Sequence, residues 1–203
     1  MSPASRKLAR TDPVLGRLIQ RVGPMTLKPS PRQTPYQALV EAVVYQQLTG
    51  KAAATILGRV IALFPGRKFP PPESVLEMHD ASYRTAGLSG AKTKAIKDIA
   101  QKKLDGIVPS SRSISKMSDV EIIDRLTTIH GVGPWTVEML LIFKLGRPDV
   151  LPSGDYGVRK GFAKVYGRKT LPTPKELLTF GERWRPYRTA AAWYLWRALE
   201  LPE

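Results

Sequence analysis

A short glycine-rich turn between two apolar segments is the part of the sequence best suited to chemistry on a charged partner. Residues 126–143 read as helix, tight turn, helix, and the turn is Gly-Val-Gly-Pro from Gly131 to Pro134. Glycine permits positive φ and a close approach of the backbone to another molecule, and proline suits the first helical position. The exposed amides at that helix start can bind a phosphate. Taken alone, such a turn is more often an ordinary connection between packed helices.

The overall charge points in the same direction as the turn. The chain has 32 Lys plus Arg against 17 Asp plus Glu, which gives a formal net charge of +15. Such a surface attracts polyanions, and nucleic acid is the first candidate partner. The alternative at this stage is a basic surface that is merely solvated.

Several classes of site and of protein are excluded by composition. No cysteine is present, so disulfides, thiolate zinc sites, cysteine nucleophiles and cysteine-ligated iron–sulfur clusters are ruled out. The two histidines, His79 and His130, are too few for a metal site built from side chains. No apolar run approaches the ~20 residues of a membrane span, and none follows the basic N-terminus as in a signal peptide. We expect a cytoplasmic, nucleoid-associated protein that makes no contact with a membrane.

The elements that position the turn are predicted to be helices. Alternating strand patterns are nearly absent, and short Pro- and Gly-rich connections separate segments of helical periodicity, so we expect an all-α protein. Capping boxes at Ser118 with Glu121 and at Thr173 with Glu176 mark two helix starts. The other expected helices begin after Asp12-Pro13 and cover about 35–64 with a possible break near Gly50, 73–78, 92–103 and 184–201.

The residues around the turn indicate what it does. Apolar helices flank it, the chain is basic, and an aspartate, Asp155, follows some twenty residues downstream. This combination resembles the helix-hairpin-helix (HhH-GPD) superfamily of base-excision DNA glycosylases, in which an aspartate at the place of Asp155 is catalytic. Asp149 is a less suitable substitute. The resemblance does not separate electrostatic stabilisation from general-base action by this carboxylate.

Further segments resemble the 3-methyladenine DNA glycosylase II branch of that superfamily. Residues 45–53 are similar to its lesion-side helix, residues 87–94 to its minor-groove loop, and residues 182–188 to its C-terminal helix. We expect the compact form of this branch, which is without the extra N-terminal β domain of longer members. The resemblance implies a two-lobed helical fold with the active-site cleft between the lobes. We expect residues 1–203 to form one such unit, with a helical lobe at about 35–115 and a hairpin lobe at 116–203 joined by the N-terminal helix at about 12–34.

The same resemblance implies which residues contact DNA. The loop formed by Leu88, Ser89 and Gly90 is the candidate probe of the duplex, and a plain turn is the alternative. Longer relatives place a bulky wedge near the position of Gly90, so in this chain the plug is either weak or supplied by Leu88. His130 is as well explained by a structural role. A cation held by hairpin carbonyls would serve DNA binding, whereas no side chains form a metal site. The DNA-binding candidates are Gly131, Val132, Gly133, Trp135, Thr136, His130, Gln46, Gln47, Leu88, Ser89, Gly90 and Lys92.

The implied reaction is hydrolysis of an N-glycosidic bond after the nucleotide is turned out of the duplex. Bifunctional relatives carry a lysine where this chain has Trp135, so we expect no Schiff base and no strand cleavage. Alkylated purines are cationic and favour electron-rich aromatic faces, and Trp135, Tyr156, Trp196 and Met139 are the candidate pocket residues. Core packing is the competing explanation for the aromatic residues.

The sequence therefore predicts a monofunctional DNA glycosylase that removes alkylated bases of the 3-methyladenine and 7-methylguanine type. We expect it to need no cofactor and to act as a monomer on double-stranded DNA. The alternative is a noncatalytic helix-hairpin-helix DNA-binding protein, which would have no reason to combine Asp155 with an aromatic pocket.

Overall fold

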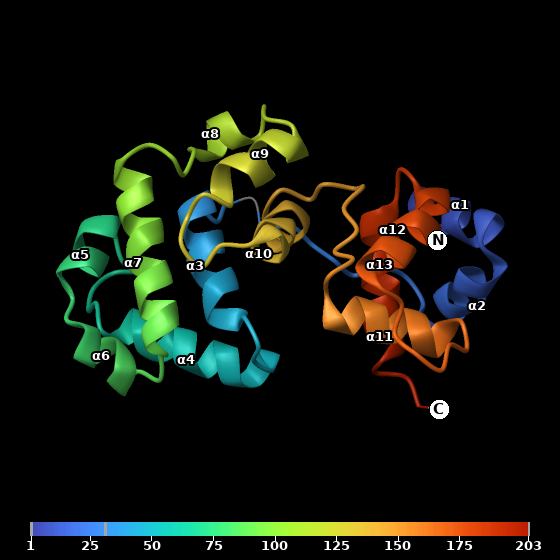
Figure 1. The fold of residues 1–203 in the computed structure, drawn as a ribbon, viewed down its shortest axis with the longest axis horizontal. Coiled ribbons are helices and arrows are strands. Elements are labelled where there is room, and N and C mark those ends of the chain that lie inside the picture. Colours follow the sequence, from blue (N-terminus) through green and yellow to red (C-terminus); the bar gives the residue numbers. More distant parts are fainter. Residues whose placement is uncertain (1, 31, 203) are drawn as a thin grey trace. The chain divides into compact units, whose positions relative to one another are not determined.

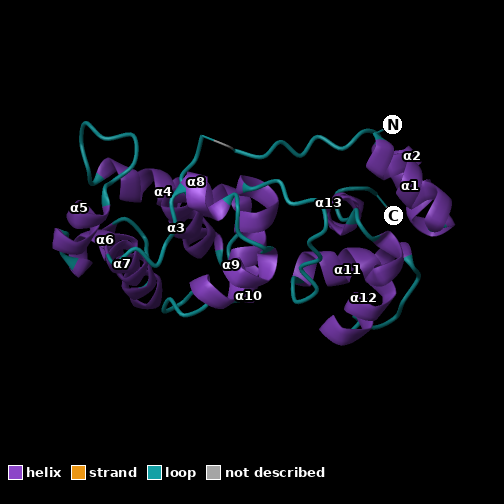
Figure 2. Ribbon diagram, turned by 90° about the horizontal axis from the view of Figure 1, so that it is seen from above, coloured by secondary structure: helices purple, strands orange, loops and turns teal. Residues whose placement is uncertain are grey.

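The computed structural model describes residues 2–30 and 32–202, and these form helices and loops without a strand (Figures 1 and 2). No helix in these two ranges has the length and apolar character needed to cross a membrane. The chain divides into two compact units. The terminal unit comprises Met1–Pro29 and Leu141–Glu203, and the central unit comprises Ser30–Leu140. The prediction of an all-α protein is thus confirmed.

The terminal unit is built from the two ends of the chain. Its N-terminal helices pack on the C-terminal ones, with α2 against α13 and α11 (Figure 1). The core includes the large buried side chains of Phe162, Trp184 and Tyr194. Its elements are α1 (Pro3–Thr11), α2 (Pro13–Val22), α11 (Tyr156–Val165), α12 (Pro174–Gly181), a 3-10 turn (Glu182–Trp184) and α13 (Arg188–Ala198).

One buried carboxylate joins these helices. Asp12 is 4% exposed and caps α2 by accepting the backbone amides of Val14 and Leu15, both at 3.1 Å. Its second oxygen accepts the Tyr166 hydroxyl at 2.6 Å and the Trp184 indole N–H at 2.9 Å. Burial and the bond to this carboxylate raise the pKa of Tyr166 far above its ordinary value. The predicted start of α2 is confirmed, and its capping residue also satisfies two donors from the other end of the chain.

Helix α1 was not predicted from the sequence. Ser2 caps it through the amide of Ser5, and Pro3 occupies its first turn. The helix is strongly basic and few of its side chains are apolar, so periodicity gave little signal. Leu8 and Ser5 are buried, and the Ser5 hydroxyl lies 3.0 Å from that of Tyr194. Tertiary contacts therefore stabilise a helix that its own pattern indicates only weakly.

The central unit holds the remaining helices. Helix α7 packs against α3, α5 and α6, and α10 packs against α3 and α9. Figure 1 shows α3 and α7 side by side in this unit. Its elements are α3 (Pro35–Tyr45), α4 (Gly50–Ala62), α5 (Pro72–Glu77), α6 (Asp80–Thr85), α7 (Gly90–Leu104), α8 (Ser111–Ile114), α9 (Asp119–Leu126) and α10 (Pro134–Met139). The π-helical turn that follows α10 (Leu140–Lys144) belongs to the terminal unit from Leu141 onward.

Most predicted boundaries are confirmed. Both capping boxes are formed, at Ser118 with Glu121 and at Thr173 with Glu176. The expected break near Gly50 is real, because α3 ends at Tyr45 and α4 begins under the cap of Thr49. The units divide the chain differently from the predicted lobes. Residues 116–140 belong with the central unit, because α10 packs against α3, whereas the sequence analysis joined them to the C-terminal part.

Replacement of Asp12 by alanine is expected to destabilise the protein by about 3 kcal/mol. The change removes a helix cap and leaves the Tyr166 and Trp184 donors without their acceptor. Urea denaturation of Asp12→Ala, compared with Asp12→Asn, measures the effect. The asparagine variant keeps one carbonyl oxygen as an acceptor, so it should lose less stability. Equal stabilities of wild type and Asp12→Ala would contradict this role.

Candidate functional site

The hairpin turn joins α9 to α10 in the central unit. Gly131 has a φ of 76°, and a Cβ at this position would lie 2.5 Å from the Cβ of Ala95 on α7. Gly133 is instead extended, with φ −96° and ψ 176°, and it precedes Pro134 at the first position of α10. Positive φ thus occurs only at the first of the two glycines. At Gly131 both the backbone dihedral and the space beside α7 require glycine.

The start of α10 is open to a ligand. No side chain caps this helix, and the amides of Thr136 and Val137 bond back to the carbonyl of Gly133 at 3.0 and 3.3 Å. Among the described residues, none accepts a hydrogen bond from the Gly133 amide, and a Cβ at this glycine would meet nothing within 4 Å. An unpaired amide at an unobstructed helix start is suited to an anionic oxygen.

Gln46 holds the hairpin from α3. Its side-chain amide nitrogen donates to the carbonyl of Gly131 at 3.0 Å and to the hydroxyl of Thr136 at 2.9 Å. Thr136 is itself 1% exposed, so its hydroxyl lies inside the protein. Both Gln46 and Thr136 were predicted to contact DNA. The structure places them against each other on the inner side of the turn, where their hydrogen bonds stabilise it.

Lys92 has a similar internal role. Its ammonium donates to the carbonyls of Val44 and Gln46, both at 2.7 Å, at the C-terminal end of α3. Burial lowers the pKa of Lys92. This lysine was also a predicted DNA contact, and in the structure it caps the helix that carries Gln46. Such a bond is a usual way to satisfy the last carbonyls of a helix.

The predicted probe loop has no protruding apolar side chain. Leu88 is 3% exposed, and Ser89 caps α7 through the amide of Lys92. Gln47 is exposed beside them and has a φ of 56°, which is rare for a residue other than glycine. These residues line a cavity of about 220 Å³. Leu88 therefore does not stand out as a wedge, and Gln47, Ser89 and Gly90 are the exposed candidates at this place.

The other hairpin candidates differ in exposure. Val132 and Met139 are buried at 4% and 9%, whereas Trp135 is half-buried. His130 is exposed, and its backbone amide donates to Asp98 on α7 at 2.7 Å. Because the side chain of Val132 is buried, this residue can contact DNA only through its backbone. Met139 is buried as well, and it contributes to the core of the central unit.

Asp155 lies in the terminal unit at the start of α11. One of its carboxylate oxygens accepts the backbone amide of Val158 at 2.7 Å and the indole N–H of Trp196, on α13, at 2.8 Å. The side chain is half-buried. The first bond is a helix cap, and the second fixes the direction of the carboxylate. The structure thus brings together two residues, Asp155 and Trp196, that the sequence analysis assigned to one site.

Two glycines allow α11 to approach α13 closely enough for this bond. A Cβ at Gly161 would overlap the backbone carbonyl of Leu195. A Cβ at Gly157 would lie 3.0 Å from the indole of Trp196 and 3.1 Å from the carboxylate of Asp155. Neither glycine was singled out in the sequence. The two glycines lie four residues apart on the helix that follows Asp155. This spacing is the signal in the sequence that could have predicted a close helix contact.

Other aromatic residues adjoin the bonded pair of Asp155 and Trp196 in the same unit. Phe143 stacks on Trp196 with ring centroids 5.8 Å apart and an interplanar angle of 23°. Phe143 is 41% exposed and Tyr156 is 63% exposed. The ammonium of Lys160 lies 5.9 Å from the Tyr156 ring centroid. Phe143 was not predicted as a site residue because it falls within an apolar run that reads as core.

Asp149, the alternative carboxylate, forms ion pairs within the protein. It bonds to Arg185 at 2.6 Å and to Arg188 at 2.8 Å, and both arginines also pair with Glu182. These bonds tie the loop before α11 to the start of α13. Asp149 thus has a structural role, which leaves Asp155 as the stronger candidate. Within residues 2–30 and 32–202, no three acidic or histidine side chains cluster as a metal site.

Replacement of Gly131 by alanine is expected to lower the free energy of unfolding by about 3 kcal/mol. The substitution combines an unfavourable φ with overlap at Ala95. Gly133→Ala is the matched control and should cost under about 1 kcal/mol, because its backbone is extended and its surroundings are open. Thermal or urea unfolding of both variants measures the difference, and equal losses would refute the assignment of strain to Gly131.

Comparison with known proteins gives full-length matches. The chain is 37% identical over 204 residues to DNA-3-methyladenine glycosylase 1 of Schizosaccharomyces pombe, covering 100% of this chain and 90% of that protein. The structure of a 3-methyladenine DNA glycosylase (Mag1) from the same organism in complex with abasic DNA matches with a TM-score of 0.93 at 37% identity, covering 98% of each chain. A DNA-3-methyladenine glycosidase from Bacillus halodurans matches with a TM-score of 0.81 at 35% identity, covering 97% of this chain and 89% of that one.

The family model described as HhH-GPD superfamily base excision DNA repair protein matches residues 40–186. This range includes the hairpin turn, Asp155, Asp149 and Arg185. The chain therefore belongs to the HhH-GPD superfamily of base excision DNA repair proteins.

Proposed function

We propose that this protein is a monofunctional DNA N-glycosylase that excises alkylated bases and uses Asp155 as its catalytic carboxylate. One observation carries the assignment of the residue: the carboxylate is held by the Val158 amide and the Trp196 indole N–H at the start of α11. A relative that is 37% identical over the full chain is a DNA-3-methyladenine glycosylase, which supports the reaction and its substrate class.

The chemistry requires a negative charge close to the deoxyribose. A base within a duplex is inaccessible, so the nucleotide is first turned out of the helix. As the glycosidic bond breaks, positive charge develops on the sugar, and the Asp155 carboxylate stabilises it or orients the attacking water. Its two bonds form in the protein without DNA, so little reorganisation is needed when the charge appears.

The product is an abasic site in an intact strand. Strand cleavage by bifunctional relatives begins with attack of a lysine amine on the sugar, and this chain has Trp135 at that lysine's place in the hairpin. An indole cannot form a Schiff base. The absence of this amine therefore favours hydrolysis alone.

The substrate is proposed to be a purine that alkylation at N3 or N7 has made cationic. The positive ring is attracted to electron-rich aromatic faces, and its departure needs no general acid. Within the terminal unit, the exposed ring of Phe143 stacks on Trp196, and the exposed Tyr156 directly follows Asp155 in the chain. They can contact an extruded base while the indole N–H of Trp196 remains on the carboxylate.

Double-stranded DNA is held through its backbone. The open amide at Gly133 can bind a phosphate and carries no sequence information, as suits an enzyme that must act anywhere in a genome. The net charge of +15 strengthens this binding at low salt. Gln46 and Lys92 contribute by keeping the turn in place from inside the central unit.

Asp155→Asn is expected to lower the single-turnover excision rate by at least about a thousandfold. The asparagine keeps a carbonyl oxygen for the Val158 amide and the Trp196 N–H, so the fold and DNA binding should change little. The measurement uses methylated DNA and chromatography of the released bases. Wild type should release 3-methyladenine and 7-methylguanine and leave strands that break only after alkali treatment.

Three outcomes would contradict this proposal. Near-normal turnover of Asp155→Asn would show that this carboxylate is not catalytic. Strand cleavage by the wild type without alkali, with a protein–DNA adduct trapped by borohydride, would contradict the monofunctional mechanism. Tight binding to DNA without release of any base would leave a noncatalytic DNA-binding protein.

Trp196→Phe is expected to reduce the excision rate about tenfold while the affinity for abasic DNA stays the same. The variant keeps an aromatic ring but loses the N–H that orients Asp155. Trp193→Phe, on the same helix, is the matched control, because Trp193 is buried elsewhere in the core and should affect stability more than rate. Equal rates for the two variants would show that the indole N–H does not position the carboxylate.

A further inference from the structure

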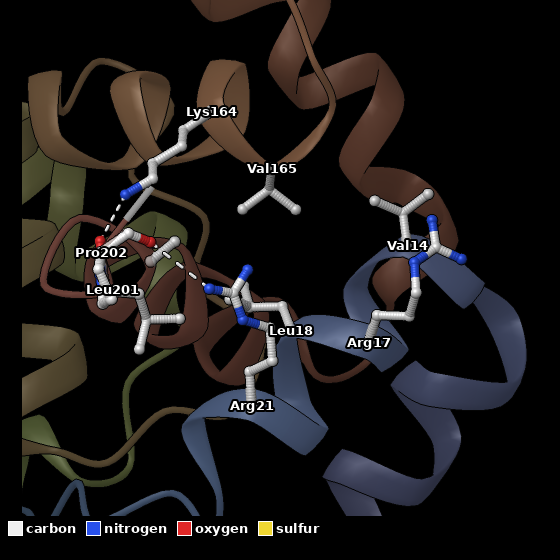
Figure 3. Close-up of a pocket in the computed structure, with 9 residues that line it drawn as sticks. Val14, Arg17, Leu18, Arg21, Lys164, Val165, Leu201 and Pro202 are labelled. Carbon is white, nitrogen blue, oxygen red and sulfur yellow. Dashed lines mark hydrogen bonds between the residues drawn. The ribbon is translucent and has the colours of Figure 1, made fainter.

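A cavity with a basic rim lies in the terminal unit, away from Asp155. It has a volume of about 390 Å³ and is bounded by α2, the end of α11 and the residues that follow α13 (Figure 3). Leu18 and Ala198 form buried apolar parts of its lining, and Arg17, Arg21 and Lys164 supply three positive charges. The space is many times the roughly 30 Å³ that one water takes up in the liquid, so it accommodates a phosphate group.

Among the described residues, no carboxylate neutralises the three cations. None of the residues that line the cavity is acidic, and no described carboxylate forms an ion pair with any of the three. Lys164 is held in place because its ammonium donates to the carbonyl of Leu201 at 2.6 Å (Figure 3). Arg17 and Arg21 are exposed on α2. An anion entering this space meets a fixed ammonium and two guanidinium groups, which suit phosphate oxygens.

The cavity is continuous with an exposed face of α11. Tyr156, Lys160 and Lys164 are spaced four residues apart and are all exposed, so they follow one face of the helix from its start to the cavity. Nine residues separate Asp155 from Lys164, a rise of about 13 Å along the helix. Each strand of duplex DNA advances about 3.4 Å per nucleotide along the duplex axis, so with α11 parallel to that axis this distance corresponds to about four nucleotides.

We propose that this cavity binds a backbone phosphate of the DNA about four nucleotides from the nucleotide that Asp155 attacks. The inference rests on the proposed function, since the excised nucleotide is the reference point. The phosphate contacts Arg17, Arg21 and Lys164 and carries no information about sequence. The subsite extends the DNA contact of the terminal unit beyond the lesion, and it adds to affinity without touching the reacting atoms.

The first test measures binding to a duplex that contains a tetrahydrofuran abasic analogue, by fluorescence anisotropy over a range of salt concentrations. Arg17→Gln/Arg21→Gln is expected to bind about tenfold more weakly near 0.1 M salt, and the slope of log K against log salt should decrease by about 1 in magnitude. Lys169→Gln/Lys175→Gln removes the same charge from exposed positions of the same unit, and it should change affinity less than about twofold. Equal effects of the two double variants would overturn the proposal.

The second test locates the phosphate. Single methylphosphonate linkages, which are uncharged, are placed at successive positions from the analogue. With wild type, affinity should fall when the neutral linkage lies about three to five nucleotides away, and with Arg17→Gln/Arg21→Gln the same linkage should have no further effect. An undiminished effect in the variant would place that phosphate elsewhere and overturn the proposal.

The alternative ligand of this cavity is a free phosphate ion. Inorganic phosphate is the probe that tests for it. If millimolar phosphate raises the melting temperature of the wild type but not of Arg17→Gln/Arg21→Gln, while the DNA assays do not distinguish the variants, the cavity binds free anions and the DNA assignment is wrong. The DNA assays use an uncleavable analogue, and the phosphate assay uses no DNA. They therefore test the cavity even if Asp155→Asn shows that the catalytic assignment has failed.

Discussion

The close approach of α11 to α13 is the constraint on which the candidate catalytic geometry depends. Gly161 lets the α11 backbone lie against the carbonyl of Leu195, and Gly157 leaves room for the indole of Trp196. At this separation the indole N–H reaches the oxygen of Asp155 that also accepts the Val158 amide. The direction of the carboxylate is thus built into helix packing, and the protein reaches the reaction with its charge already oriented.

The hairpin depends on an equivalent support inside the central unit. Gly131 fits against Ala95 because it lacks a side chain, and Gln46 bonds to the Gly131 carbonyl and to Thr136. Lys92 in turn caps the helix that carries Gln46. These contacts satisfy the polar groups on the inner side of the turn and leave the Gly133 amide for a ligand. The proposed binding of DNA by backbone amides therefore relies on side chains that face the protein.

Several residues of suitable type for DNA contact serve the fold instead. Lys92 has the charge of a phosphate ligand, yet its ammonium caps α3, and Leu88 has the size of a wedge but is buried. Asp149 has the chemistry of a catalytic carboxylate and forms ion pairs with Arg185 and Arg188. Residue type and approximate position narrow the candidates. The direction of a side chain decides among them, and that direction follows from packing.

The amino-acid sequence by itself determined the helical class, the start of α2 at Asp12, both capping boxes, the hairpin turn and the exclusion of cysteine chemistry, since each depends on composition or on residues within about four positions. Tertiary structure alone decided that Gln46 bonds to the hairpin 85 positions away and that Trp196 bonds to Asp155 across 41 positions. It also stabilised α1, whose own pattern is weak. Such contacts depend on the whole path of the chain, because helices meet where their surfaces fit, and no local pattern encodes that meeting.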